Sequence, residues 1–343
     1  MSATKLETPV TAVGIAVKGN PTKDGKFEET EYTIEELNPG QVLVKITATS
    51  ICHTDFQCFN TDGAVPGHEM CGKIEAMADD VKDLKIGQRV AIGWQRSSCR
   101  DCEFCNKGEE NMCQKKTNFQ DGKAGWATYV VWDAHFVAPV PDSIEDSAVA
   151  PLMCAGTTVY NAFKQNGVKK GDKVAIVSIG GLGHLGLMIA HKMGCEVTAI
   201  SRGMDKKEEA EGFGANKYID SKNKDHVKAA EKEFDFMLIT TPADLDCDMY
   251  ASMIQPQHGV MCFVGVPPSF KFTFGIYPII VDNIKITGSL IASPETTNEM
   301  LKFCADNDVQ PTIERFEFNA DAFLKAVKRV NDNEIRFRAV MLL

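Results

Sequence analysis

Side chains that could bind a metal ion occur at two places far apart in the sequence. Cys52 offers a thiolate, His68 an imidazole and Cys154 a second thiolate. A catalytic zinc ion commonly has three protein ligands and one open position, so these three side chains suit that chemistry. Taken alone, however, Cys154 would more often be an ordinary buried cysteine. Three polar residues lie close to the first two candidates in sequence: Thr54, Asp55 and Glu69.

A second group of possible ligands consists of four closely spaced cysteines: Cys99, Cys102, Cys105 and Cys113. Four thiolates at this density repel one another unless a cation neutralises them, and a closed tetrahedral zinc site does so. Redox-active cysteine pairs are the alternative, which the fourth cysteine disfavours. Because all four zinc positions would be filled by sulfur, we expect this site to stabilise the fold and to take no part in the chemistry.

A glycine motif in the middle of the chain indicates a nucleotide site. Residues 173–179 form an apolar, β-branched run, which is typical of a strand buried on both faces. The motif follows at once, and residues 185–190 continue as a helix. Glycines in that context let the backbone approach a pyrophosphate, which the helix N-terminus attracts. We therefore expect a dinucleotide to contact Gly181, Leu182, Gly183, His184, Leu185 and Gly186.

The end of the second strand of this fold indicates which dinucleotide is preferred. An NAD enzyme commonly has Asp or Glu there, roughly 20 residues into the motif. In this chain the position is Ser201, followed by Arg202, and no carboxylate is present. Arg202 can bind a 2′-phosphate through charge-assisted hydrogen bonds, and Lys206 and Lys207 add positive potential. An ordinary solvated turn is the alternative. We expect NADPH to be preferred over NADH.

The remaining sequence predicts a mostly β part and an alternating α/β part. Short strands and turns are expected between residues 11 and 49, and further strands at 86–93 and 130–141, with a helix starting at 143–151. From residue 173 to about 290, apolar strands alternate with polar helical stretches, which predicts a doubly wound parallel sheet. The clearest later strands are 234–240, 259–265 and 284–290. We expect one domain of residues 1–155 and 292–343, and a second of residues 156–291.

Together these motifs resemble those of the zinc-dependent medium-chain alcohol dehydrogenases. Gly67-His68-Glu69-x-x-Gly72, followed by Ala78 and Val81, is that family's zinc signature. Cys52-His53-Thr54-Asp55 and Pro151-Leu152-x-Cys154-Ala155-Gly156 resemble the cinnamyl-alcohol-dehydrogenase group, in particular its broad-specificity NADPH-dependent aldehyde reductases. The resemblance covers essentially the whole chain. It implies a GroES-like, mostly β catalytic domain and a Rossmann domain, with the active site in the cleft between them.

The resemblance also implies roles for individual residues. Cys52, His68 and Cys154 would hold the catalytic zinc, and Glu69 would tune or visit it. The Thr54 hydroxyl would pass the substrate proton toward the cofactor ribose, and the Asp55 carboxylate would orient the His68 ring. Arg338 matches an arginine that contacts a cofactor phosphate. Two zinc ions per subunit are implied, the second in the four-cysteine lobe, and so is a homodimer formed through an edge strand of the nucleotide domain.

Two departures from the family pattern concern the active site. Many relatives have a histidine three residues after the threonine as the outer end of a proton relay, and this chain has Gln57. Glutamine cannot titrate near neutral pH, so water or another group must finish the relay. The segment between Cys52 and His68 is also shorter than in typical relatives, so their substrates cannot be assumed. Phe56 and Trp94 are candidate pocket walls, with core packing an equal possibility.

Composition limits the remaining possibilities. The 343 residues carry a formal net charge of −10, which argues against nucleic acid and anionic membranes as partners. Residues 1–10 do not resemble a signal peptide and no apolar run is long enough to span a bilayer, so we expect a cytoplasmic protein. The cysteines outside the two groups are expected to be reduced and mostly buried: Cys58, Cys71, Cys195, Cys247, Cys262 and Cys304.

The sequence therefore favours a zinc-dependent, NADP-linked oxidoreductase that acts on an aldehyde or primary alcohol, chiefly as an aldehyde reductase. An NAD-linked alcohol or polyol dehydrogenase is one alternative, against which Ser201 and Arg202 argue. A non-catalytic protein that binds zinc and a nucleotide on the same fold is the other.

Overall fold

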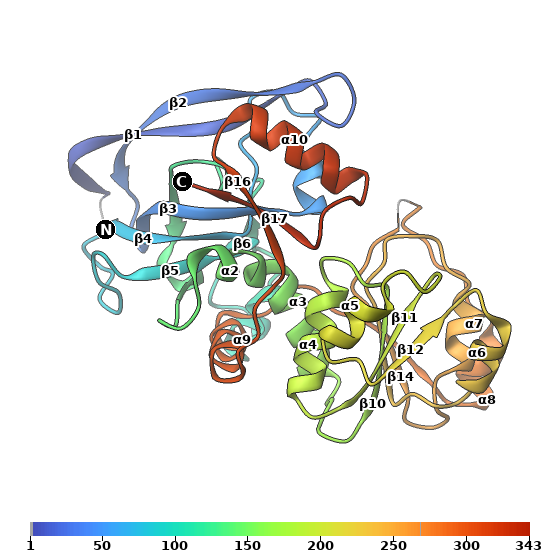
Figure 1. The fold of residues 1–343 in the computed structure, drawn as a ribbon. Coiled ribbons are helices and arrows are strands. Elements are labelled where there is room, and N and C mark those ends of the chain that lie inside the picture. The colour runs from blue at the N-terminus through green and yellow to red at the C-terminus, as the bar shows by residue number, and fades with distance from the viewer. Residues whose placement is uncertain (1–2, 268) are drawn as a thin grey trace. The chain divides into compact units, whose positions relative to one another are not determined.

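A computed structural model describes residues 3–267 and 269–343, which form two compact units (Figure 1). The first unit contains the chain up to Cys154 together with Ala292–Asp306 and Gln310–Leu343. The second unit contains Ala155–Ile291 and Asn307–Val309. The metal-ligand candidates all lie in the first unit and the glycine motif lies in the second.

A seven-stranded sheet forms the core of the first unit. Its strand order is β16-β17-β3-β4-β5-β9, and β8 pairs with β3. Only β16 and β17 pair in parallel, and the other pairings are antiparallel. The strands are β3 (Gln41–Ile51), β4 (Met70–Met77), β5 (Arg89–Ile92), β8 (Tyr129–Asp133), β9 (Val137–Pro139), β16 (Ile313–Glu317) and β17 (Arg338–Leu342).

A long two-stranded ribbon accompanies this sheet. β1 (Thr4–Lys18) and β2 (Lys26–Leu37) have 15 and 12 residues and pair in antiparallel register. The expectation of short strands in this part of the sequence was therefore wrong. Helix α10 (Ala320–Asn331) packs Phe323 into the same apolar cluster as Phe27 and Ile15, which lie on the ribbon (Figure 1). That packing lets a strand pair remain stable outside the main sheet.

Short helical segments and a small lobe complete the first unit. The lobe contains β6 (Gln95–Ser97), α1 (Glu103–Asn106), η2 (Glu110–Met112) and β7 (Thr117–Asn118). The other segments are η1 (His53–Cys58), η3 (Ala134–Phe136), α2 (Asp146–Pro151) and α9 (Pro294–Asn307). α2 continues into a π-helical turn, η4 (Leu152–Gly156), and the chain then enters the second unit with α3 (Thr157–Gln165). Such turns are uncommon and often occur at functional sites.

The second unit contains a six-stranded, wholly parallel sheet of order β12-β11-β10-β13-β14-β15. This is the doubly wound arrangement, and it confirms the predicted fold class. The strands are β10 (Lys173–Val177), β11 (Glu196–Ser201), β12 (Lys217–Asp220), β13 (Phe236–Ile239), β14 (Val260–Phe263) and β15 (Lys285–Gly288). Besides α3, the helices of this unit are α4 (Gly183–Lys192), α5 (Lys207–Gly212), α6 (Lys224–Ala229), α7 (Cys247–Ser252) and α8 (Ile276–Val281).

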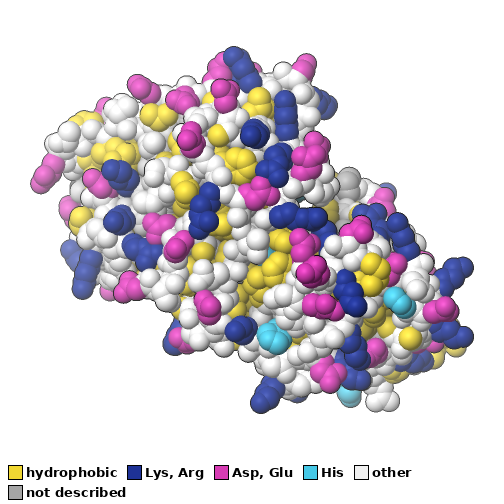
Figure 2. All heavy atoms as spheres, in the orientation of Figure 1, with side chains coloured by type: hydrophobic (Ala, Val, Ile, Leu, Met, Phe, Trp, Pro, Cys, Tyr) yellow, Lys and Arg dark blue, Asp and Glu magenta, His cyan; other side chains and the backbone are white. Residues whose placement is uncertain are grey.

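The surface charges and the cysteines can be compared with the expectations from composition, and those about partners stay predictions. Figure 2 shows acidic and basic side chains interspersed on the face in view, without the continuous basic field that nucleic acid attracts. In the parts of the chain that the structure describes, no helix has the length and apolar character needed to cross a membrane. The twelve cysteines are all free thiols, and the six outside the ligand groups are buried, as predicted.

Candidate active site

Four side chains from three segments of the chain meet in the first unit: Cys52, His68, Glu69 and Cys154. Each contributes one ligand atom, and these atoms all lie within 4.8 Å of one another. His68 and Glu69 are fully buried, whereas the two cysteines are half-buried. Cys52 caps the start of η1, and Cys154 lies in the π-helical turn η4. The structure thus brings together the residues that the sequence proposed as catalytic zinc ligands.

The Asp55 carboxylate fixes the His68 ring. His68 Nδ1 lies 2.7 Å from Asp55 Oδ1, and both side chains are fully buried. The same carboxylate accepts hydrogen bonds from the backbone N–H of Cys52 at 2.9 Å and of Gly67 at 3.1 Å. A carboxylate on Nδ1 is the usual means of presenting Nε2 to a metal ion. Asp55 therefore links the two segments that carry Cys52 and His68.

The other ring nitrogen of His68 shows that these residues suit a zinc ion. Nε2 is buried and has no hydrogen-bond partner among the described residues. A buried polar atom without a partner is costly, and a metal bond would satisfy it. Hydrogen bonding to the Cys154 thiol lowers the pKa of Cys52 well below its ordinary value, so this sulfur takes the thiolate form that binds metal. Two sulfurs and one imidazole are a donor set that zinc accepts.

Gly67 allows the chain to bring His68 into this position. Its φ is +108°, in the region that favours glycine. A Cβ atom there would lie 2.6 Å from the Trp126 backbone nitrogen and 2.5 Å from its ring. Any side chain at this position would push the two segments apart. The glycine of the zinc signature therefore has a steric reason in this fold.

Glu69 forms a buried ion pair behind the ligands. Its carboxylate accepts hydrogen bonds from the Arg338 guanidinium and from the Ser50 hydroxyl. Burial raises the pKa of Glu69, and the nearby Arg338 charge opposes that change. Arg338 is only 7% exposed. Its predicted contact with a cofactor phosphate stays a prediction, because the structure shows the guanidinium bound to Glu69.

Aromatic side chains near the ligands were only partly foreseen. Phe119 is fully buried, its ring centroid lies 4.7 Å from that of His68, and its N–H donates to the Trp94 carbonyl at 3.0 Å. No sequence signal had pointed to Phe119, since it lies in irregular chain after β7. Phe56 stacks on Phe59 with centroids 4.7 Å apart, and Trp94 packs against a second core cluster. Their roles as pocket walls stay predictions.

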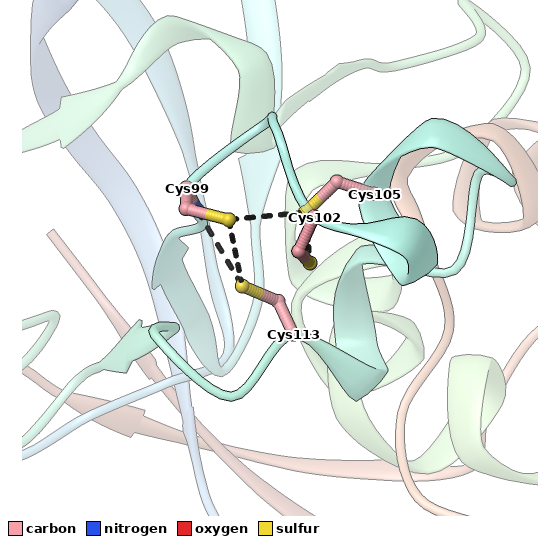
Figure 3. Close-up of side chains that lie close together, drawn as sticks. All are labelled: Cys99, Cys102, Cys105 and Cys113. Atoms are coloured by element: carbon pink, nitrogen blue, oxygen red, sulfur yellow. Dashed lines mark hydrogen bonds between the residues drawn. The ribbon is translucent and has the colours of Figure 1, made fainter.

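The four cysteines of the small lobe form a separate cluster, in which the side chains converge (Figure 3). The Sγ–Sγ distances are 3.5 Å between Cys102 and Cys105, 3.5 Å between Cys99 and Cys113, and 3.9 Å between Cys99 and Cys105. Zinc–sulfur bonds of about 2.3 Å in a tetrahedron require sulfur separations of about 3.8 Å. The sulfurs therefore stand where a closed zinc site needs them, with no open position.

The glycine motif of the second unit has the expected strand-turn-helix context. It joins β10 to α4, and a Cβ atom at Gly183 would lie only 1.9 Å from the Ser178 carbonyl oxygen. At Gly186 a Cβ atom would meet Ile176 of β10 at 3.3 Å. These glycines thus allow the turn and the close packing of helix on strand, which is the arrangement that holds a dinucleotide pyrophosphate.

The segment predicted to select the dinucleotide lies at the carboxyl end of β11. Ser201 is the last residue of that strand, and Arg202 is exposed just beyond it. The Lys206 amino group donates to the Ile179 carbonyl of the glycine turn at 2.6 Å, so it lies next to the motif. Lys207 begins α5 and forms an ion pair with Glu211 at 3.7 Å. These positions agree with the positive charge predicted for the segment. They do not test whether it binds a 2′-phosphate.

Comparison with known proteins identifies the family. Residues 38–142 match the alcohol dehydrogenase GroES-like domain, and residues 181–306 match the zinc-binding dehydrogenase domain. A probable formaldehyde dehydrogenase from Bacillus subtilis is 38% identical over 92% of this chain and 94% of its own length. An aldehyde reductase from Escherichia coli, YahK, is 32% identical over 92% of this chain and 94% of its own length.

A solved structure agrees with these relatives. It is a cinnamyl alcohol dehydrogenase from Helicobacter pylori in complex with NADP(H), with a TM-score of 0.87, 28% identity, and coverage of 97% of this chain and 98% of that one. The matched domains, the ligand cluster and the parallel sheet lead to the same conclusion. This chain is an oxidoreductase that belongs to the zinc-dependent alcohol dehydrogenase family.

Proposed function

We propose that this protein is a zinc-dependent aldehyde reductase that uses NADPH, and that it interconverts small aldehydes and primary alcohols. The observation that carries the proposal is the cluster of Cys52, His68 and Cys154, in which His68 Nε2 has no hydrogen-bond partner among the described residues. The proposal is supported by the names of relatives, among them an aldehyde reductase, and by a structural neighbour in complex with NADP(H).

The residues of the cluster would hold the metal while others handle the proton. Zinc held by Cys52, His68 and Cys154 supplies electrophilic assistance to the substrate oxygen, and bound NADPH supplies the hydride. Asp55 keeps the His68 ring in the orientation that presents Nε2. The Glu69 carboxylate would tune the metal through its negative charge while it stays paired with Arg338. Each of these tasks needs a side chain that is fixed before substrate arrives.

Proton transfer would begin at Thr54. Its hydroxyl, two residues after Cys52, can donate to or accept from a substrate oxygen. Gln57 follows in η1, is exposed, and its amide oxygen accepts from Gln120 at 3.4 Å. A glutamine side chain has no titratable group, so water or another group would have to finish the relay.

NADPH preference is supported by the segment after β11. An Asp or Glu in place of Ser201 would repel a 2′-phosphate. The serine hydroxyl can instead donate a hydrogen bond to the phosphate, and Arg202 can neutralise its charge. One charged hydrogen bond is worth roughly 1.5–3 kcal/mol, so Arg202 alone can supply about a 10- to 150-fold preference. Arg202→Ala should lose that preference mainly through a higher KM for NADPH.

A homodimer and the domain roles belong to the same proposal. On α8, four apolar side chains are 55–71% exposed: Ile276, Tyr277, Ile280 and Val281. The neighbouring β15 is an edge strand, which a second copy could extend while covering this helix. Residues 1–155 with 292–343 would act as the catalytic domain and residues 156–291 as the cofactor domain. The free cysteines suit a reducing, cytoplasmic location.

A simple experiment tests the proposed reaction. The protein is mixed with a small aldehyde and either NADPH or NADH, and the loss of nicotinamide absorbance is followed. We expect turnover with NADPH at least 10-fold more efficient than with NADH. Equal efficiency with both would contradict the cofactor assignment, and no turnover with either in zinc-loaded protein would favour a non-catalytic binder.

Light scattering of the wild type and of Ile280→Asp tests the dimer.

A further inference from the structure

The segment proposed to bind the 2′-phosphate is held in place by the neighbouring edge strand. β12 pairs in parallel with β11, with Asp220 opposite Ser201. Gly203 is hydrogen-bonded on both sides by side chains of β12: its N–H donates to Asp220 Oδ1 at 2.8 Å, and its carbonyl accepts from the Tyr218 hydroxyl at 2.9 Å. The Ser201 carbonyl accepts from the Ser221 N–H at 2.9 Å.

The conformation of Gly203 explains why these contacts matter. Its φ is +82°, and a Cβ atom there would meet no atom of the described residues within 4 Å. Glycine is therefore suited to this position by its backbone conformation, since there is space for a side chain. A glycine without contacts would sample many conformations. The two side chains of β12 restrict it to one, and Arg202 is then held between a fixed peptide group and the end of β11.

We propose that Tyr218 and Asp220 are positioning residues that hold Arg202 ready for a 2′-phosphate and so set the preference for a phosphorylated ribose. The inference rests on the proposed NADPH preference. It attributes the fixed backbone conformation at Arg202 to residues that do not touch the ligand. An arginine whose backbone is fixed beforehand loses less conformational entropy on binding. The hydrogen bonds of β12 thereby contribute to affinity for the phosphate without contacting it.

Asp220 provides a sharp test of the inference. Its hydrogen bond to Gly203 and its negative charge should have opposite effects on phosphate binding. Its Oδ1 accepts from the N–H groups of both Gly203 and Lys222, at 2.8 and 2.9 Å. These backbone hydrogen bonds lower the pKa of Asp220, so the carboxylate is ionised at neutral pH. Its negative charge alone would repel a phosphate. Removing the side chain should therefore strengthen phosphate binding if charge dominates, and weaken it if positioning dominates.

The test is equilibrium binding of adenosine 2′,5′-bisphosphate and of 5′-AMP to the full-length protein by titration calorimetry. The two ligands differ only in the 2′-phosphate. In the wild type we expect the bisphosphate to bind about 10- to 150-fold more tightly. Equal affinities in the wild type would refute the NADPH assignment itself. A clear preference establishes that assignment and leaves the variants to test the positioning role.

Tyr218→Phe removes one hydroxyl and should reduce the preference for the bisphosphate about 3- to 10-fold, with 5′-AMP binding unchanged. Tyr32→Phe is the matched control, because the Tyr32 hydroxyl also donates to a backbone carbonyl, that of Tyr129, in the other unit. Asp220→Ala should reduce the preference as well, and it provides a second variant if Tyr218→Phe proves unstable.

A double variant separates positioning from a general loss of structure. If Tyr218 acts through Arg202, then Tyr218→Phe should have little further effect on the preference in an Arg202→Ala background. An unchanged preference in Tyr218→Phe, or a stronger one in Asp220→Ala, would overturn the inference while leaving the NADPH assignment intact.

Discussion

Two clusters of metal-binding side chains lie in the same unit and are built in different ways. The four cysteines come from one short segment, residues 99–113, and three of them are only half-buried. The other cluster combines side chains from the N-cap of η1, the loop just before β4 and the π-helical turn η4, with a fully buried His68. The first cluster needs little beyond its own loop, whereas the second exists only when distant elements are in place.

The surroundings of the two clusters differ as much as their construction. The cysteine sulfurs mostly face one another, so a metal ion there would be enclosed by four equal donors (Figure 3). His68 instead has Asp55 behind it and Phe119 against its ring, and in the part of the chain that the structure describes its Nε2 has no hydrogen-bond partner. A closed site suits stability and a supported, three-ligand site suits chemistry. The same donor types therefore serve different purposes because of what holds them.

The largest effect is expected for Cys154→Ser. Loss of one of three catalytic ligands should lower kcat/KM by at least on the order of 10³-fold, equivalent to about 4 kcal/mol. Thermal stability should change little, since the four-cysteine cluster is untouched. Elemental analysis should fall from two zinc ions per subunit to one. An active wild-type enzyme with a single zinc per subunit would contradict the assignment of two zinc sites.

Cys102→Ser should produce the opposite pattern. Losing a closed metal site removes binding free energy that contributes to folding. We expect the thermal midpoint to fall by roughly 10 °C or more, while kcat per folded molecule stays within about twofold. Thermal unfolding and active-site titration measure the two quantities. If the variant kept its midpoint but lost turnover, the division of labour between the clusters would be reversed.

Thr54→Ala isolates proton handling from metal binding. Removing the hydroxyl should lower kcat about 10²-fold with both zinc ions retained. Thr54→Ser keeps a hydroxyl and should restore most of the activity, which makes it the control. Gln57→His should raise activity or move the pH optimum by adding a titratable group. Wild-type turnover in Thr54→Ala would show that the proton takes another route.

Phe119→Leu tests whether the ring that packs on His68 matters for activity. Changing a residue behind a metal ligand commonly costs 10- to 100-fold, and for an apolar contact we expect a smaller fall in kcat/KM, about 3- to 10-fold. Phe136→Leu is the control, because Phe136 lies in the same core cluster. Both variants should lose comparable stability in urea. Equal activities would mean that Phe119 only fills space.

The smallest effect is expected from a polar cluster around Asp146, which we do not propose to bind metal. The Asp146 carboxylate accepts from the Thr47 hydroxyl at 2.5 Å and from Arg89 Nε at 2.9 Å. Burial would raise the pKa of Asp146, but these partners outweigh it and lower the pKa below its ordinary value near 3.8. The ionised form is thus favoured by folding, and its contribution is lost as pH falls through the lowered folded-state pKa.

Asp146→Asn should therefore lower the free energy of unfolding by about 1 kcal/mol at pH 5–7, and the difference from wild type should shrink below pH 3.8. Urea unfolding of both proteins at several pH values measures it. Acid releases metal from both alike, so the difference isolates the carboxylate. A difference that grew as the pH fell would have the wrong sign for a lowered pKa.

The sequence was informative where chemistry or burial restricts residue types. The four cysteines are recognisable because their spacing is local, and β10, β11 and β13 because strands buried on both faces are continuous apolar runs. β12 was not identified, since a short edge strand with Lys217 and Asp220 has no such run. The full length of β1 was missed because polar residues near Thr4 hide its pairing.

Contacts between distant segments could not be predicted in the same way. The contact of the Phe119 ring with the His68 ring depends on how an irregular loop is placed, for which periodicity gives no signal. The π-helical turn that carries Cys154 looks like ordinary helix in the sequence. The pairing of Arg338 with Glu69 joins residues 269 positions apart, and family resemblance had assigned the arginine to a cofactor phosphate instead.

That long separation has a consequence for synthesis of the protein. A chain made from its N-terminus exposes residues 99–113 early, and the four cysteines can bind metal as soon as their loop has left the ribosome. Glu69 is made earlier still, but Arg338 follows only after 269 further positions, and a buried carboxylate without its partner is strongly unfavourable. The cluster around His68 can therefore be completed only near the end of translation. The two metal sites should be loaded in a fixed order, with the cysteine site first.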